Sequence, residues 1–337
     1  MVRSPRSLWD APARVWFQHN RRLPPVVASP PIRPAAPAGP AQRRFAAFAW
    51  VVLAYNVAVI LWGAYVRAAG AGNGCGDNWP LCDGQFLPAH PQIKMLIEFL
   101  HRATSGVDAV LVFGLLAGAV WLYPKRHVVR RGAAAAALFI VTEALLGAAL
   151  VLFQWVGQNT SPARIAADAT HLANTLCLLA ALALTAIWAS GVAAPRRAPG
   201  WRLNLAIIAV LTTAICGAVA ALADTLFPAQ SLTVALRQDF SGSTALLERL
   251  RVIHPAVAIV AGLYLLWLVF DGLPRPGQRL ARDLGYGLAA AVLVQWAGGA
   301  LDVLLLAPVP MQMLHLASAD LLWILLLLLT AATMAEA

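Results

Sequence analysis

The sequence contains eight long apolar segments, and each is long enough to cross the hydrocarbon core of a bilayer. They lie at about 45–66, 94–122, 132–154, 165–191, 201–223, 249–270, 281–306 and 311–335. A transmembrane helix needs about 20 apolar residues, and lipid supplies no partners for backbone N–H and C=O groups, so such segments must be helical. The sequence therefore predicts an all-α polytopic membrane protein with eight transmembrane helices.

Composition supports this fold class and argues against a nucleic-acid partner. Hydrophobic residues make up 60% of the chain and charged residues only 12%, whereas a soluble domain is about 25% charged. The net charge of +10 comes mainly from arginines in the N-terminal tail and in alternate links between the apolar segments. By the positive-inside rule these charges set the topology. We expect both termini to be cytoplasmic and the first loop to be extracytoplasmic. The basic residues of the second, fourth and sixth links are Lys125, Arg126, Arg130, Arg131, Arg196, Arg197, Arg202, Arg275, Arg279 and Arg282.

The first 44 residues are rich in Pro, Arg and Ala and contain no sustained apolar stretch. A cleavable signal peptide needs an apolar core after its basic start, so this segment is not one. The proline content favours a disordered cytoplasmic tail, while the arginine content keeps an organellar transit peptide as the alternative. We accordingly expect a multi-pass protein of the cell inner membrane rather than of the mitochondrial inner membrane.

The apolar segments form an internal repeat. His101 follows Gly63 by 38 residues, and His254 follows Gly217 by 37 residues. The glycine-containing stretches LLGAALVLF (around Gly147) and WAGGALDVL (around Gly298) also match, and each precedes a segment with one early histidine, His171 or His315. The sequence therefore predicts two four-helix halves, 45–191 and 201–335, with the same membrane orientation.

Four histidines lie at one expected depth in the bilayer. His101, His171, His254 and His315 fall within about two turns of the start of the even-numbered segments, which places them roughly 6–11 Å below the outer boundary. Two imidazoles facing each other in a four-helix bundle can hold haem iron from both sides. The alternative is a set of hydrogen-bonded core histidines; zinc and copper are less favoured, because neither half supplies further ligands. The histidines of the links, His90 and His127, are expected to be solvated.

The second segment begins with an ionisable pair. Glu98 precedes His101 by three residues, so both side chains lie on one helix face, whereas Arg251 is at the matching position before His254. A similar spacing recurs at Asp168 before His171. We expect Glu98 to act directly in catalysis by accepting protons or stabilising a developing cation; the alternative is a partner that orients its histidine.

Four arginines lie near the same outer boundary of the expected bilayer. Their guanidinium groups would either pair with haem propionates or extend to the interface with the charge in water. These residues are Arg67, Arg102, Arg249 and Arg251.

Cys75 and Cys82 share a loop that contains Gly and Pro on the expected extracytoplasmic side, where disulfides persist. A disulfide between them is one interpretation, and a labile bridge that exchanges electrons with a thiol partner is another. Cys177 and Cys216 lie inside apolar segments and are expected to be small buried hydrophobes.

These residues resemble those of the haem A synthase family. The resemblance lies in GAYVRAAGAGNGCGDNWPLCDG after the first segment, IEFLHR opening the second, ATHLANT in the fourth, VIHP in the sixth and LHLASADLLW in the eighth. It covers about residues 60–325, which is nearly all of the membrane part. The WPLC loop followed by EFLHR is the most specific of these combinations, whereas the fifth link is not distinctive.

The resemblance implies conversion of haem O to haem A, by oxidation of a ring methyl group to a formyl group for cytochrome oxidase biogenesis. It implies that His254 and His315 ligate a haem b cofactor in the C-terminal half. It places the substrate haem O between His101 and His171, with Glu98 beside it, and makes Cys75 and Cys82 the family's extracytoplasmic pair. The implied partners are the haem O synthase that supplies the substrate, membrane lipid, and an electron acceptor or donor that the sequence does not identify. Self-association into a homo-oligomer is compatible with the sequence.

Three other functions are less well supported. A di-haem b electron-transfer subunit is the main alternative, and the difference between Glu98 and Arg251 argues against two equivalent redox haems. A transporter would need Gly/Pro-broken helices at the midplane. A haem O-forming farnesyl transferase would need acidic clusters to bind a metal diphosphate, and no Asp-rich motif is present.

Overall fold

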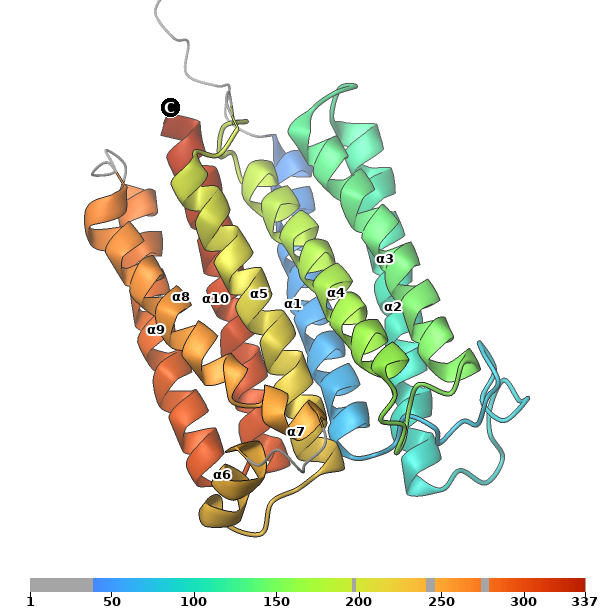
Figure 1. Ribbon diagram of the computed structural model, residues 1–337. Helices are drawn as coiled ribbons and strands as arrows, with labels where there is room; N and C mark the ends of the chain where they lie inside the picture. Colours follow the sequence, from blue (N-terminus) through green and yellow to red (C-terminus); the bar gives the residue numbers. More distant parts are fainter. Residues whose placement is uncertain (1–38, 196–197, 241–245, 274–278, 337) are drawn as a thin grey trace, which may run out of the picture. The chain divides into compact units, whose positions relative to one another are not determined.

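The computed structural model describes residues 39–195, 198–240, 246–273 and 279–336, and within these ranges all regular elements are helical (Figure 1). Eight helices are long and apolar enough to cross a membrane, which confirms the predicted fold class. They are α1 (Pro40–Ala68), α2 (Ile93–Leu122), α3 (Val128–Leu152), α4 (Pro162–Ala189), α5 (Trp201–Leu226), α8 (Ile253–Trp267) with its π-helical continuation η1 (Leu268–Gly272), α9 (Arg279–Leu304) and α10 (Val309–Glu336).

The first helix begins earlier than the apolar pattern suggested. Residues 40–44, which we assigned to the tail, form the first turns of α1. Pro40 occupies the start of the helix, where its missing N–H removes no intrahelical hydrogen bond, and the Gln42 side chain accepts from the Gly39 backbone N–H at 3.1 Å. The remainder of the predicted tail lies outside the described residues, as do Arg196, Arg197 and Arg275.

The fifth link contains two short helices that the sequence did not predict, α6 (Leu232–Phe240) and α7 (Leu246–Leu250). Leu247 of α7 packs with Leu222 and Ala223 of α5 in a small hydrophobic cluster. The predicted sixth segment, 249–270, was therefore placed too early, because its start belongs to α7 and the membrane helix α8 begins at Ile253.

Helices α4 and α10 are the innermost of the bundle. Buried residues make up 61% and 56% of their apolar spans, against 17–39% for the other six. The two helices are joined by a buried hydrogen bond in which Trp323 Nε1 donates to the Leu176 carbonyl at 2.9 Å. The remaining helices therefore have broad apolar faces free to contact lipid, which is the arrangement expected of a multi-pass membrane protein.

Polar side chains inside the bundle join neighbouring helices. Asn56 of α1 donates from Nδ2 to Asp108 Oδ2 of α2 at 2.6 Å, and both residues are buried. A polar group in an apolar span is costly unless it has a partner. The helices α1 to α10 belong to one compact unit, Ala38–Ala337.

Candidate functional site

A glycine lies directly against the imidazole of His101, and the same contact recurs at His254. A Cβ added to Gly63 on α1 would lie 2.9 Å from Cε1 of His101, and one added to Gly217 on α5 would lie 2.9 Å from Cε1 of His254. Real Cβ atoms almost never approach so closely. Only glycine therefore lets each imidazole occupy this position against the preceding membrane helix.

His254 and His315 face each other across the bundle. Their ring centroids are 6.3 Å apart and their planes are 85° apart. A metal ion held by two opposed imidazoles, with metal–nitrogen bonds of about 2.0–2.1 Å, would place the ring centroids roughly 6.4 Å apart. The observed separation thus fits two ligands of one iron atom.

The hydrogen bond of His254 fixes which nitrogen is available to a metal. Its Nδ1 lies 3.1 Å from the Thr213 carbonyl oxygen of α5, and because a carbonyl only accepts, Nδ1 must carry the proton. A metal-bound histidine commonly donates its second ring N–H to a backbone carbonyl. Nε2 of His254 is therefore left for the metal.

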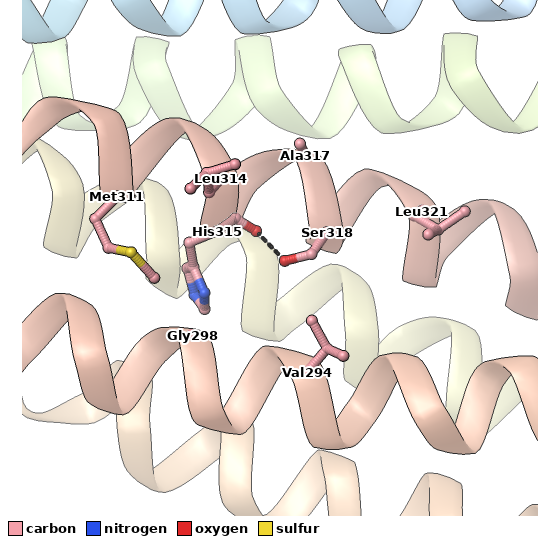
Figure 2. Close-up of a pocket in the computed structure, with 8 residues that line it drawn as sticks. All are labelled: Val294, Gly298, Met311, Leu314, His315, Ala317, Ser318 and Leu321. Atoms are coloured by element: carbon pink, nitrogen blue, oxygen red, sulfur yellow. Dashed lines mark hydrogen bonds between the residues drawn. The ribbon is translucent and has the colours of Figure 1, made fainter.

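His315 is approached by α9 in a similar way. A Cβ on Gly299 would lie 3.1 Å from its Cε1, and Figure 2 shows the ring directed from α10 toward Gly298 on α9. The Gln295 side-chain amide lies 3.0 Å from Nδ1 of His315. A cavity between α9 and α10 reaches the imidazole; it is lined by Val294, Gly298, Met311, Leu314, His315, Ala317, Ser318 and Leu321.

His171 has a carboxylate neighbour that the sequence analysis did not identify. Oε1 of Glu143, on α3, lies 3.5 Å from Nδ1 of His171. The same carboxylate accepts from Asn174 Nδ2 at 2.5 Å and from the Thr175 hydroxyl. A single acidic residue in the otherwise apolar run of α3 was the available signal, since such residues mark functional sites by default.

Asp168 does not pair with His171 in the way its spacing suggested. Its Oδ2 lies 3.5 Å from Nε of Arg164, one turn earlier on α4. Arg164 also donates from NH1 to the Gly157 carbonyl at 2.6 Å. The Asp168–Arg164 pair therefore belongs to the start of α4 and its preceding loop.

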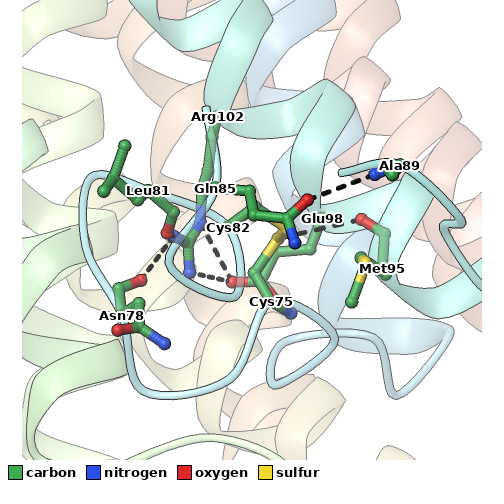
Figure 3. The surroundings of a disulfide bond; sticks show 9 residues. All are labelled: Cys75, Asn78, Leu81, Cys82, Gln85, Ala89, Met95, Glu98 and Arg102. Atoms are coloured by element: carbon green, nitrogen blue, oxygen red, sulfur yellow. Dashed lines mark hydrogen bonds and ion pairs between the residues drawn. A yellow bond between two sulfur atoms is a disulfide. The ribbon is translucent and has the colours of Figure 1, made fainter. Parts of the chain in front are cut away.

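Glu98 is buried and both of its carboxylate oxygens accept hydrogen bonds (Figure 3). Oε2 accepts from the backbone N–H of Cys75 at 2.9 Å, and Oε1 accepts from Arg102 at 2.5 Å. Arg102 in turn donates to the carbonyls of Asn78 and Leu81 at 2.7 Å each. The Glu98–Arg102 pair thus attaches the 75–82 loop to the first turns of α2.

Cys75 and Cys82 form the disulfide that closes this loop, with an S–S distance of 2.00 Å. This bond confirms the disulfide interpretation. Both half-cystines are buried. Cys177 and Cys216 are free thiols of intermediate exposure.

The other arginines have protein partners in the described structure. Arg67 of α1 donates from NH1 to the Ala221 carbonyl at 2.6 Å and to Thr225 Oγ1 at 2.7 Å, both on α5. Arg251 donates to Asp224 Oδ1 at 3.0 Å. The side chain of Arg249 lies outside the described residues.

His127 was expected to be a solvated loop residue; it lies in the link before α3 and is partly exposed, but its ring also makes specific contacts. Its Nδ1 accepts from the Val129 backbone N–H at 3.3 Å, which caps α3, and its ring stacks on Tyr123 with centroids 4.7 Å apart. Burial lowers the pKa of His127 from its ordinary value. His90 is exposed, as predicted.

The fold and the site define a polytopic, all-helical membrane protein with histidines placed inside its helix bundle. Among the described residues, no group of three or more His, Cys, Asp or Glu side chains is arranged to hold a metal ion. The chain belongs to the COX15-CtaA family, described as cytochrome oxidase assembly protein, whose model matches residues 46–327. Membership implies haem-related chemistry.

Two kinds of curated relative were found. A protoheme IX farnesyltransferase of Thermus thermophilus is 46% identical over 303 residues, covering 88% of this chain and 49% of the relative. A heme A synthase of Alkalihalophilus pseudofirmus is 37% identical over 134 residues, 39% of this chain and 41% of that protein. One of Bacillus mycoides is 40% identical over 115 residues, 33% and 36% of the two chains. The chain thus spans about half the length of the Thermus protein and less than half of the Alkalihalophilus one.

Proposed function

We propose that this protein is a haem A synthase that oxidises a methyl group of haem O to a formyl group. The observation that carries the proposal is the His254–His315 pair, with ring centroids 6.3 Å apart. Family membership over residues 46–327 and the two relatives named heme A synthase support it.

In this proposal His254 and His315 hold a haem b cofactor, which when bound supplies electron transfer. The Thr213 carbonyl fixes the His254 tautomer, and Gly217 and Gly299 give the two imidazoles room. Hydrogen bonding of the second ring nitrogen orients such a ligand and increases its basicity.

His101 and His171 flank the substrate haem O, and Gly63 provides the space beside His101. Conversion of a methyl to a formyl group adds one oxygen atom to the carbon and removes two hydrogens, with an external oxidant taking up the electrons. The protons that are released need an acceptor in the site. Glu98 takes that role when Arg102 releases it. Otherwise its hydrogen bonds to Cys75 and Arg102 keep the carboxylate oriented and the disulfide loop in place. Arg67, Arg102 and Arg251 would meet the propionates only by exchanging their present partners.

The proposed membrane topology rests on the distribution of basic residues among the links and on the position of the disulfide. We propose two repeated four-helix halves, 45–191 and 201–335, with both termini in the cytoplasm of a bacterial cell and the Cys75–Cys82 loop on the oxidising side of the inner membrane. The Gly63–His101 and Gly217–His254 contacts support the repeat.

A haem O synthase is the proposed source of the substrate. The Thermus relative, of which this chain matches about half, is itself named protoheme IX farnesyltransferase. An electron acceptor or donor completes the proposed set of partners.

The test is to express the protein together with a haem O-producing enzyme and to analyse the extracted haems by mass. A formyl haem should appear only when both proteins are present. Folded protein that retains haem but yields no formyl haem would overturn the assignment.

The alternative, a di-haem b electron-transfer subunit, is favoured by the recurrence of the Gly–His contact in both groups of helices. Glu98→Gln distinguishes the two functions. A synthase variant should keep its haem b and lose turnover, whereas an electron carrier should retain full haem reduction and yield no formyl haem even as wild type.

A further inference from the structure

Helices α3 and α9 carry matching stretches in which an acid on one replaces an amide on the other. EALLGAALVL runs from Glu143 to Leu152, and QWAGGALDVL runs from Gln295 to Leu304. Glu143 precedes Gly147 by four residues, and Gln295 precedes Gly299 by four, so this register pairs Gly147 with Gly299, one residue beyond the Gly298 of the sequence comparison. From these matching positions and the contacts below, we infer that Glu143 is the positioning residue of His171 and that the Glu143/Gln295 difference gives the two histidines unequal donor strength toward bound haem. The inference deepens the proposed function and rests on it for the identity of the haem beside His171.

The two side chains make corresponding contacts with their histidines. Glu143 Oε1 lies 3.5 Å from Nδ1 of His171, and the Gln295 amide lies 3.0 Å from Nδ1 of His315. In both cases the neighbour comes from the preceding membrane helix and approaches the same ring nitrogen. The Glu143 carboxylate can only accept, so Nδ1 of His171 carries the proton and Nε2 is left for iron. The same holds for His315 when the Gln295 amide presents its oxygen to Nδ1, since an amide N–H in that place would make Nδ1 the acceptor.

The surroundings of the two side chains correspond as well. Asn174 follows His171 by three residues and donates to Glu143 Oε2 at 2.5 Å. Ser318 follows His315 by three residues, and its Oγ lies 2.7 Å from the Gln295 amide. Thr175, the next residue on α4, donates its hydroxyl to Glu143. Hydrogen bonds therefore hold both side chains in place beside the rings.

The chemical consequence follows from the charge. A histidine that binds iron through Nε2 carries its proton on Nδ1, and a carboxylate attracts that proton more strongly than an amide oxygen does. The imidazole beside Glu143 thus gains basicity and donates more electron density to iron, which favours the ferric state. The hydrogen bonds around a haem ligand are one means by which a protein tunes potential. His171 is accordingly the stronger donor and His315 the weaker one.

The test is a reciprocal exchange, Glu143→Gln and Gln295→Glu, in the full-length protein purified with its haem. Gln295→Glu should shift the midpoint potential of haem b to lower values, with haem content unchanged. Glu143→Gln should shift the potential of haem O bound in the N-terminal half to higher values and lower formyl-haem production. Thr142→Val is the matched control, because it removes a 2.6 Å hydrogen bond to Asn174 without changing charge, and both potentials should stay at wild-type values.

Unchanged potentials in both exchange variants, with wild-type haem content and thermal stability, would overturn the inference and leave Glu143 a structural residue. If an exchange variant loses its haem, Glu143→Asp and Gln295→Asn are measured instead. These variants keep the charge or the amide on a shorter side chain, so the order of the two midpoint potentials should remain that of the wild type. The midpoint potential of haem b can be measured without catalytic turnover. If wild-type protein makes no formyl haem but Gln295→Glu shifts that potential, the synthase assignment fails while the tuning role stands.

Discussion

Gly63 and His101 are in direct contact, so that a single added methyl group at Gly63 would lie 2.9 Å from Cε1 of the imidazole. Gly217 and His254 repeat the relationship on α5 and α8 at the same distance. Each of these histidines is therefore positioned by the absence of a side chain on the preceding membrane helix. This contact gives the first prediction.

Gly63→Ala should displace the His101 ring, and Gly217→Ala should displace the His254 ring, because a Cβ at 2.9 Å from Cε1 forces the imidazole or its helix to shift. Overpacking of this kind costs about 1–3 kcal/mol. We expect Gly217→Ala to lower bound haem b, and Gly63→Ala to lower formyl-haem production while haem b is retained; haem extraction and absorption spectra measure both. Gly147→Ala is the control, since nothing lies within 4 Å of a Cβ there. Wild-type haem content in Gly217→Ala would contradict the prediction.

Arg102→Ala should loosen the 75–82 loop. Arg102 donates to two loop carbonyls at 2.7 Å and to Glu98, and hydrogen bonds involving a charged group contribute about 1.5–3 kcal/mol each. Because about 1.4 kcal/mol corresponds to a factor of ten, limited proteolysis within the loop should be roughly tenfold faster or more. Asp77→Ala changes an exposed residue of the same loop and should cleave at the wild-type rate. Equal rates for the two variants would show that Arg102 does not hold the loop.

Thr225→Val should weaken the attachment of α1 to α5. The substitution removes the hydroxyl that accepts from Arg67 at 2.7 Å, and loss of one partner of a buried donor costs about 1–3 kcal/mol. We expect a lower thermal unfolding temperature in detergent. Thr333→Val is the matched control. Like Thr225, Thr333 donates its hydroxyl to the carbonyl oxygen four residues earlier, but no arginine of the described part of the chain donates to it. A shift of the same size in both variants would assign the effect to the threonine itself.

His127 should make stability depend on pH. Its neutral Nδ1 accepts from Val129 N–H, and burial lowers its pKa below the ordinary value, so the unfolded chain binds the proton more readily. The contribution to stability is therefore complete above a pH of about 6.5 and is lost as the pH falls below it. Unfolding temperatures of wild type and His127→Asn, measured between neutral and acidic pH, should diverge only on the acidic side. Parallel curves would remove His127 as the cause.

The number and type of the membrane-spanning helices could be predicted from the sequence because they depend on local properties. A run of about 20 apolar residues must form a helix in lipid, and eight such runs fixed the fold class. The spacing of each histidine from the start of its run likewise placed His101 and His254 near the beginnings of α2 and α8. The short helices α6 and α7 were missed because their hydrophobic burial depends on contact with α5 rather than on their own pattern.

The neighbours of each charged side chain were decided only by the tertiary structure. Spacing along α4 favoured Asp168 as the partner of His171, yet Asp168 pairs with Arg164 and the carboxylate beside His171 is Glu143 of α3. Successive residues rotate by about 100° around a helix axis, so the face that meets another helix depends on how both are rotated and packed. The sequence alone determined the spans and the two cysteines of the disulfide, and it predicts a common depth for the four histidines. Helix packing determined which glycine, carboxylate or amide meets each imidazole, because those contacts join residues that are distant along the chain.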